Sequence, residues 1–353
     1  MRPFTAIILG ATTLLTAATA PAATITITDC GVSPVEKVGK RTVISRPADD
    51  VTIQCALLPL AGTTRIEITA RSVTADGAQG GSIVAAGKGL AIEIVATGTD
   101  ADDRSVALTR STLTAANPNG DVEISGPGAI LVGDSALQAG GFLRISCSGP
   151  SCPITLDGSR LAANDIELAA QGDVTGRSSR LETASPIDTI TVTSATGDVK
   201  ITNAVGANAA VGSFICRDDI IRLCPGPDCP LPVTIDSVDA AVAFCECNQE
   251  DVPEIETGIE GDLRVEAPQG DVDLRGAKVK VGEDVTVTAG GTADVGDASV
   301  QNCGPKTGRI TVTAATCKIA NATLLDDEPD PQPSLQCTVQ GQATQLGSCD
   351  AQR

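Results

Sequence analysis

One short pattern recurs along the sequence, in which apolar residues alternate with variable residues and a small residue closes the unit. Residues 122–126 and 190–194 are two copies of this pattern. Alternation with a period of two predicts a short β-strand with one buried face. Successive copies lie 21–25 residues apart within two groups, which begin at Val122, Leu143, Ile166 and Ile190, and at Leu263, Val285 and Ile310.

This spacing predicts an all-β fold in which the chain stacks coils of about 21–25 residues into a β-solenoid. Two or three short strands fit in each interval, and no helical periodicity lies between them. A β-sandwich is the alternative, but it needs antiparallel hairpins with turns every 8–12 residues. Several strands follow a Gly-Asp pair, such as Gly172-Asp173 and Gly197-Asp198. We expect each pair to form a sharp corner, because glycine tolerates positive φ and aspartate caps its own turn.

The composition excludes several functions. The 353 residues include no His, Trp or Tyr, and the net charge is −19. Without histidine there is no Ser-His-Asp relay and no His-ligated metal. Few aromatic rings leave little surface for stacking sugars or bases. The acidic charge argues against nucleic acid and anionic membranes as partners.

The first residues predict export. Residues 1–22 read as a signal peptide, with Arg2, an apolar run and the small residues Ala20-Pro21-Ala22 before the expected cleavage. No later stretch is apolar enough for membrane insertion. A secreted protein is therefore expected, in the periplasm, on the cell surface or outside the cell.

Thirteen cysteines favour disulfides in such an oxidising compartment, and the odd number leaves one without an internal partner. A zinc site is the competing interpretation. A Cys-x-Gly-Pro-x-Cys-Pro motif occurs twice, at Cys147–Cys152 and Cys224–Cys229, and each copy reads as a rigid loop clamp or a binding loop. Sequence proximity predicts four pairs, namely Cys30 with Cys55, Cys147 with Cys152, Cys303 with Cys317, and Cys337 with Cys349.

The repeat also predicts the domain organisation. The solenoid is expected over residues 23–325, interrupted by a cysteine-rich insertion at 204–260. An acidic, proline-rich linker follows at 326–333, and 334–353 reads as a disulfide-closed tail. The main candidate for a cofactor site is a weak Ca²⁺ site, at Asp100, Asp102 and Asp103.

The coil pattern resembles bacterial secreted right-handed parallel β-helix proteins over most of residues 24–325. The resemblance implies two branches, haemagglutinin-like adhesins and pectate-lyase-like enzymes. The chain departs from the lyases because it has no His and no aromatic sugar platform. We therefore expect an exported, non-catalytic solenoid with a structural, cell-surface or adhesive role. Its expected partner is a cell-surface or extracellular protein or polysaccharide. The alternative is a Ca²⁺-dependent polysaccharide lyase or hydrolase.

Overall fold

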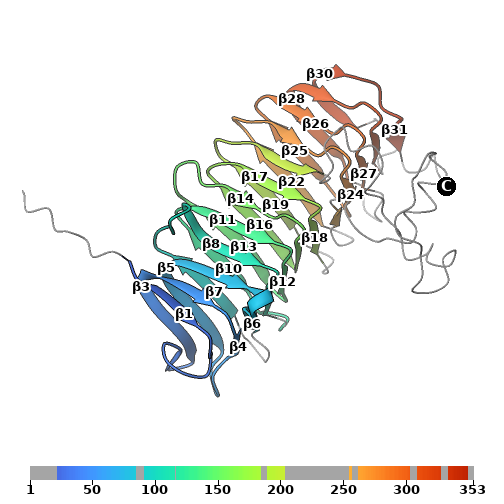
Figure 1. Cartoon of the computed structure of the whole chain (residues 1–353). Helices are drawn as coiled ribbons and strands as arrows, with labels where there is room; N and C mark the ends of the chain where they lie inside the picture. Colours follow the sequence, from blue (N-terminus) through green and yellow to red (C-terminus); the bar gives the residue numbers. More distant parts are fainter. Residues whose placement is uncertain are drawn as a thin grey trace, which may run out of the picture.

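The computed structural model describes residues 22–84, 91–115, 117–183, 189–202, 254–256, 261–302, 308–326 and 333–348. In these ranges the chain is a stack of β-strand coils that forms an elongated rod (Figure 1). A single 3-10 turn, Gly77–Gln79, is the one helical segment of the described chain. All strand pairs there are parallel except β2 with β3, which confirms the predicted parallel β-solenoid.

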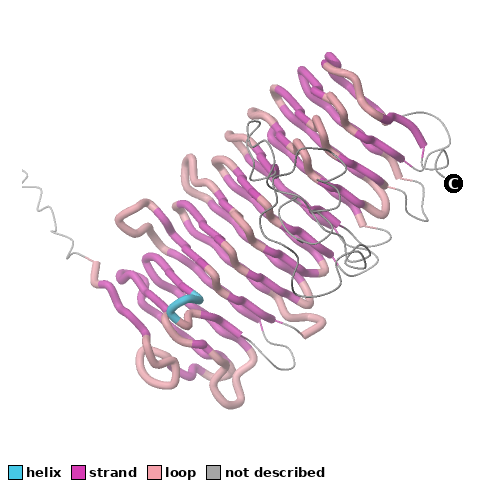
Figure 2. The backbone as a smooth tube through the Cα atoms, turned by 45° about the vertical axis from the view of Figure 1, so that its right-hand side comes forward, coloured by secondary structure: helices cyan, strands magenta, loops and turns pink. Residues whose placement is uncertain are grey.

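Each coil contributes strands to three faces of the rod, and the faces stay aligned along the whole stack (Figure 2). Face one consists of the first halves of β3 (Arg41–Ile53) and β5 (Arg65–Asp76), then β7 (Ala91–Ala96), β10 (Val122–Gly126), β13 (Phe142–Cys147), β16 (Asp165–Ala170), β19 (Thr189–Ser194), β22 (Asp262–Ala267), β25 (Val285–Ala289), and the first halves of β28 (Ile310–Lys318) and β30 (Ser334–Gln340).

Face two follows face one in each coil. It consists of β1 (Thr24–Ile27), the second halves of β3, β5, β28 and β30, and between them β8 (Arg104–Thr109), β11 (Ala129–Gly133), β14 (Ile154–Thr155), β17 (Val174–Arg177), β20 (Val199–Thr202), β23 (Val272–Asp273) and β26 (Thr292–Asp294). The four long strands run across the corner, so faces one and two form one continuous sheet.

Face three is a separate sheet of 11 strands. It consists of β4 (Ala56–Leu57), β6 (Ser82–Val84), β9 (Thr112–Ala115), β12 (Ala136–Ala139), β15 (Arg160–Ala163), β18 (Arg180–Thr183), β21 (Glu254–Glu256), β24 (Lys278–Lys280), β27 (Ser299–Gln301), β29 (Thr323–Asp326) and β31 (Gln345–Ser348). A short strand, β2 (Glu36–Val38), pairs antiparallel with the start of β3 at the N-terminal end of the stack.

The core is a column of aliphatic side chains, because the alternating pattern turns every second residue inward. Ile94, Ile124 and Ile145 lie in register on face one of successive coils, and each is fully buried. Burying one such side chain stabilises the fold by about 1.5–3 kcal/mol. The narrow interior is filled without large rings, which explains how the chain folds with few aromatic residues.

The Gly-Asp pairs have a role that differs from the expected one. The glycines of the described pairs do not adopt positive φ. Instead, aspartates at the corner between faces one and two link successive coils: Asp173 accepts a hydrogen bond from the N–H of Asp198 (2.9 Å), and Asp198 accepts one from the N–H of Asp271 (2.9 Å). A Cβ on Gly197 would lie 2.3 Å from Oδ1 of Asp173. Glycine is therefore required by the close approach of the neighbouring coil.

The corner between faces two and three carries a second ladder, which the sequence did not predict. Ser135 and Ser159 are buried there, and their hydroxyls donate to backbone carbonyls of the preceding coil, to Leu108 O (3.3 Å) and Val132 O (2.7 Å) respectively. The residue before each serine, Asp134 or Gly158, adopts positive φ. Two residues therefore turn the chain between the faces. Ser111 and Ser179 occupy the same position in other coils.

The disulfides agree only in part with the predicted pairs. Cys30–Cys55 and Cys147–Cys152 are present as expected. The prediction for the C-terminal region is wrong, because Cys317 pairs with Cys337 instead of with Cys303. Strands β28 and β30 pair in neighbouring coils, and Cys337 lies where their register shifts, so that its Cα is 5.7 Å from that of Cys317. Cys303, Cys349, Cys224 and Cys229 lie outside the described residues.

Two predicted boundaries also need correction. Residues 334–353 were expected to form a separate tail after a linker at 326–333, but 334–348 form another coil through β30 and β31. Asp326 closes β29 and is fully buried, so it belongs to the solenoid. This coil was not predicted because its alternation of apolar and polar residues is weak.

Candidate functional site

Ion pairs between neighbouring coils cover much of face one. Glu123, Arg144 and Glu167 lie in register in three successive coils, at the second position of the repeat units that begin at Val122, Leu143 and Ile166. Arg144 binds Glu167 at 2.7 Å, and its guanidinium lies 4.8 Å from the ring centroid of Phe142. Both charged side chains are partly exposed, so the pair adds at most about 1 kcal/mol. The pair thus balances one positive against one negative charge on this face.

Face two carries a similar column toward the C-terminal end. Lys200, Asp273, Asp294 and Lys318 follow one another in register in successive coils. The hydrogen bond from the Asp271 N–H and the bond from the Lys200 ammonium (2.6 Å) lower the pKa of Asp198. The same contact with Asp198 raises the pKa of Lys200.

Arg275 completes this group on face two. It binds Asp273 through two nitrogen atoms, with its Nη2 at 2.7 Å from Oδ2, and this hydrogen bond raises the pKa of its guanidinium. Asp294 lies 3.8 Å from both Arg275 and Lys318. These carboxylates are thus paired with cations, which does not suit a general acid or a metal ligand set.

The predicted Ca²⁺ site at Asp100, Asp102 and Asp103 does not form. Arg104 occupies the first two carboxylates, with its Nε 3.1 Å from Oδ2 of Asp100 and its Nη2 bound to Asp102. Burial alone would raise the pKa of Asp100. Hydrogen bonds from the backbone N–H groups of Arg104 and Asp102 outweigh this effect, so the pKa is lowered. Within the described residues, no group of three Asp, Glu or Cys side chains is arranged to hold a metal ion. The prediction from the sequence did not consider that Arg104, which directly follows the three aspartates, binds two of their carboxylates.

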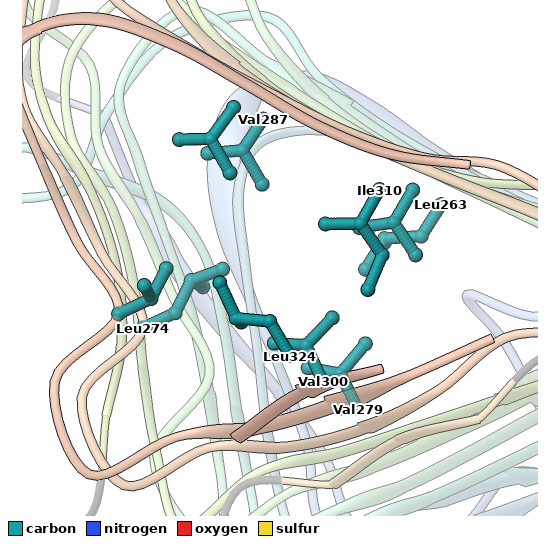
Figure 3. Close-up of a pocket in the computed structure, with 10 residues that line it drawn as sticks. Leu263, Leu274, Val279, Val287, Val300, Ile310 and Leu324 are labelled. Atoms are coloured by element: carbon teal, nitrogen blue, oxygen red, sulfur yellow. The ribbon is translucent and has the colours of Figure 1, made fainter. Parts of the chain in front are cut away.

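A cavity lies inside the rod between the C-terminal coils (Figure 3). Its ten lining residues are all Leu, Val or Ile, among them Leu263, Val287, Val300 and Leu324. Most of these side chains belong to strands of faces one and three, while Leu274 and Val295 directly follow the face-two strands β23 and β26. Such an apolar space stays dry and offers no group that could bind or activate a polar substrate.

The largest departure from the repeat lies at the corner between faces two and three. In one coil, two residues separate Arg177 from Arg180. Arg177 pairs in register with Thr202 of the next coil, and Arg180 pairs with Glu254. The chain between Thr202 and Glu254 holds 51 residues, numbered 203 to 253, in place of two. The following coil again turns with two residues, Gly276-Ala277.

The predicted insertion at 204–260 therefore lies mostly outside the described residues. Its predicted end at residue 260 is wrong. The chain has rejoined the stack at β21, which begins at Glu254 and pairs with strands on both sides. The stack above and below this point keeps its register, since β19 pairs directly with β22. The solenoid thus carries a long segment at one corner without a break in the sheets.

The fold places the chain among parallel β-solenoid proteins, and no comparison with known proteins identifies it more narrowly. No family model, curated protein or solved structure matches the sequence. In the ranges that the structure describes, no helix is long and apolar enough to span a membrane. The three disulfides between described cysteines indicate folding in an oxidising compartment outside the cytoplasm.

Proposed function

We propose that this chain is an exported, non-catalytic β-solenoid that acts as a rigid structural or adhesive element at or beyond the cell surface. The observation that carries the proposal is the insertion of residues 203–253 at a corner where neighbouring coils need two residues. In repeat proteins, insertions emerge as loops on one side of the stack, often the side that binds a partner.

The coils around the insertion support a scaffold role. Strands β18, β21 and β24 stay in register on face three, although 51 residues intervene before Glu254. Hydrogen bonds between coils, such as those accepted by Asp173 and Asp198, hold the stack at another corner. A scaffold whose strands stay in register on both sides of residues 203–253 is suited to hold a partner-binding segment on a stiff base.

The paired surface charges are the reason to prefer a non-catalytic role. Hydrolytic and lyase chemistry needs carboxylates or bases whose pKa values are tuned toward neutral pH. The pKa of Asp100 and of Asp198 is lowered, and both are bound to cations. Such groups stay ionised and cannot donate a proton to a leaving group.

The first experiment locates the protein and removes the insertion. Cells that make the chain are fractionated, and the purified protein is tested for binding to their surface and to panels of extracellular proteins and polysaccharides. In one variant, Gly-Ala replaces residues 203–253, which copies the corner at Gly276-Ala277. A matched control replaces the segment with a Gly/Ser linker of equal length.

Both variants should be exported and give the β-rich circular dichroism of the parent, and both should lose binding. Recovery of the parent in the cytoplasm as a reduced protein would contradict export. Full binding by the Gly-Ala variant would exclude a binding role for the insertion. Release of unsaturated sugar from a polysaccharide panel with Ca²⁺ would refute the non-catalytic role and support the lyase alternative.

A further inference from the structure

A short segment at the N-terminal end of the rod precedes the first full coil (Figure 1). This segment, residues 22–40, is called the N-terminal cap below. Its strands lie along one edge of β3, where β1 pairs parallel with residues 50–53 and β2 pairs antiparallel with residues 41–43. Ile27 of the cap lies in register with Ile53, whose side chain is fully buried. The cap therefore covers the backbone edge of β3 and the start of the core.

Few non-covalent contacts hold the cap in place. Strand β1 has four residues and β2 has three, so the strand pairing is brief. One exposed hydrogen bond joins Nζ of Lys37 to the carbonyl oxygen of Ala61 (2.5 Å). Within residues 22–40 the buried side chains are those of Ile27, Cys30 and Val35. Short strands that bury so little apolar surface are marginally stable by themselves.

A disulfide adds a covalent link between the cap and the first coil. It joins Cys30 to Cys55, which directly precedes β4. Cys55 is only partly buried, whereas Cys147 and Cys152 in the middle of the rod are each 3% exposed. Exposed disulfides are reduced more readily than buried structural ones. The link spans 25 residues, so its cleavage returns considerable conformational freedom to the cap.

We propose that Cys30–Cys55 is a redox-sensitive clasp, whose reduction releases the N-terminal cap and uncovers the edge of β3. The reductant is a dithiol. One of its thiolates attacks the sulfur of Cys55, and Cys30 leaves as a thiolate and takes up a proton. The second thiol of the reductant then displaces Cys55 as a thiol. Two electrons pass to the protein, and the reductant becomes a disulfide.

The release has a consequence for the surface of the rod. Strand β3 is 13 residues long, and both of its pairing partners on this edge, β1 and β2, belong to the cap. An uncovered strand edge pairs readily with an extended segment of another chain. The clasp thus determines when this end of the rod presents an edge for strand pairing.

The test uses the full chain in its oxidised form, with dithiothreitol as the dithiol. Hydrogen exchange of the β1 and β2 amides should become at least about tenfold faster on reduction, because the cap opens more often without its covalent link. Amides of β7 and β10 should keep their rates. Alkylation followed by mass spectrometry should detect Cys30 and Cys55 as thiols before Cys147 and Cys152. Reoxidation should restore the protection of the cap.

Two double variants separate this clasp from the other disulfides. Cys30→Ser with Cys55→Ser should show the fast exchange of β1 and β2 without any dithiol. The matched control, Cys317→Ser with Cys337→Ser, removes another disulfide that has a partly buried member and should leave the cap protected.

Three results would each overturn the proposal. The first is equal exchange of the cap amides in the oxidised parent and in the variant without the clasp. The second is faster exchange along the whole rod on reduction, since the disulfide would then hold the entire fold. The third is reduction of Cys147–Cys152 before Cys30–Cys55. The measurements on the parent with dithiothreitol decide the matter alone if the variant without the clasp does not fold.

Discussion

Replacing Gly197 with alanine tests the idea that close approach between coils explains the Gly-Asp pairs. The added Cβ would lie 2.3 Å from Oδ1 of Asp173, 2.7 Å from its backbone nitrogen and 2.7 Å from the carbonyl carbon of Gly172. The carboxylate can rotate away, but the backbone atoms of the neighbouring coil cannot. The two coils must therefore separate locally, which also weakens the 2.9 Å hydrogen bond from Asp198 to Asp173.

The expected cost follows from these contacts. Overpacking of a tight contact costs about 1–3 kcal/mol, and loss of one intramolecular hydrogen bond costs about 1 kcal/mol more. The variant Gly197→Ala should therefore lose about 2–4 kcal/mol of unfolding free energy. The matched control is Gly133→Ala, since a Cβ at Gly133 meets no atom within 4 Å. This control should equal the parent or gain up to about 1 kcal/mol, because alanine restricts the unfolded chain.

Urea unfolding followed by far-UV circular dichroism measures both variants against the parent. A long repeat can unfold in more than one step, so the order of the midpoints is the decisive readout. Hydrogen exchange should show faster opening around residue 197 and unchanged rates at the N-terminal coils. If Gly197→Ala and Gly133→Ala unfold at the same urea concentration, glycine is not required by close approach and the proposed role of the ladder is wrong.

Three further predictions concern the other ladders and the last coil. The pKa of Asp198 is lowered in the folded chain, so the ionised carboxylate should stabilise the fold above its ordinary pKa of 3.8. This contribution should be lost as pH falls through the pKa of the folded state. In Asp198→Asn, the free energy of unfolding measured with urea should therefore fall less steeply as the pH is lowered. Ser159→Ala leaves the buried N–H of Ser135 without its 3.2 Å partner and should cost about 1–3 kcal/mol in the same assay. Cys317→Ser with Cys337→Ser removes a closed loop worth about 3 kcal/mol, and amide exchange should speed up in the last coil while the central coils stay protected.

The sequence was sufficient to predict the coils because the alternating pattern repeats at a spacing that matches one turn of the stack. Val122, Leu143 and Ile166 were recognised as equivalent residues, and the structure places them in register. Local contacts were also predictable, as in Cys147–Cys152. Strands and short-range contacts can be predicted because they depend on residues that are close together in the sequence.

Contacts between coils were harder to predict, because their partners lie about one coil away and depend on the register. Sequence proximity predicts Cys349 as the partner of Cys337, but stacking of the coils brings Cys337 to Cys317. The serine ladder was missed for the same reason, since Ser159 donates to a carbonyl 27 residues earlier. The Ca²⁺ prediction failed because the charge of Arg104 was not weighed against three neighbouring aspartates.

Polymer physics explains why the corner can hold so long an insertion. Lengthening the connection at this corner from two residues to the 51 residues at 203–253 costs only about 3 kcal/mol of loop-closure entropy, because this cost grows with the logarithm of length. Burial of two isoleucine or leucine side chains offsets this cost. The coils before and after the insertion provide many such side chains, and their register depends on strand pairing instead of on the corner. The segment at this corner can therefore change in length and sequence while the rod that carries it stays folded.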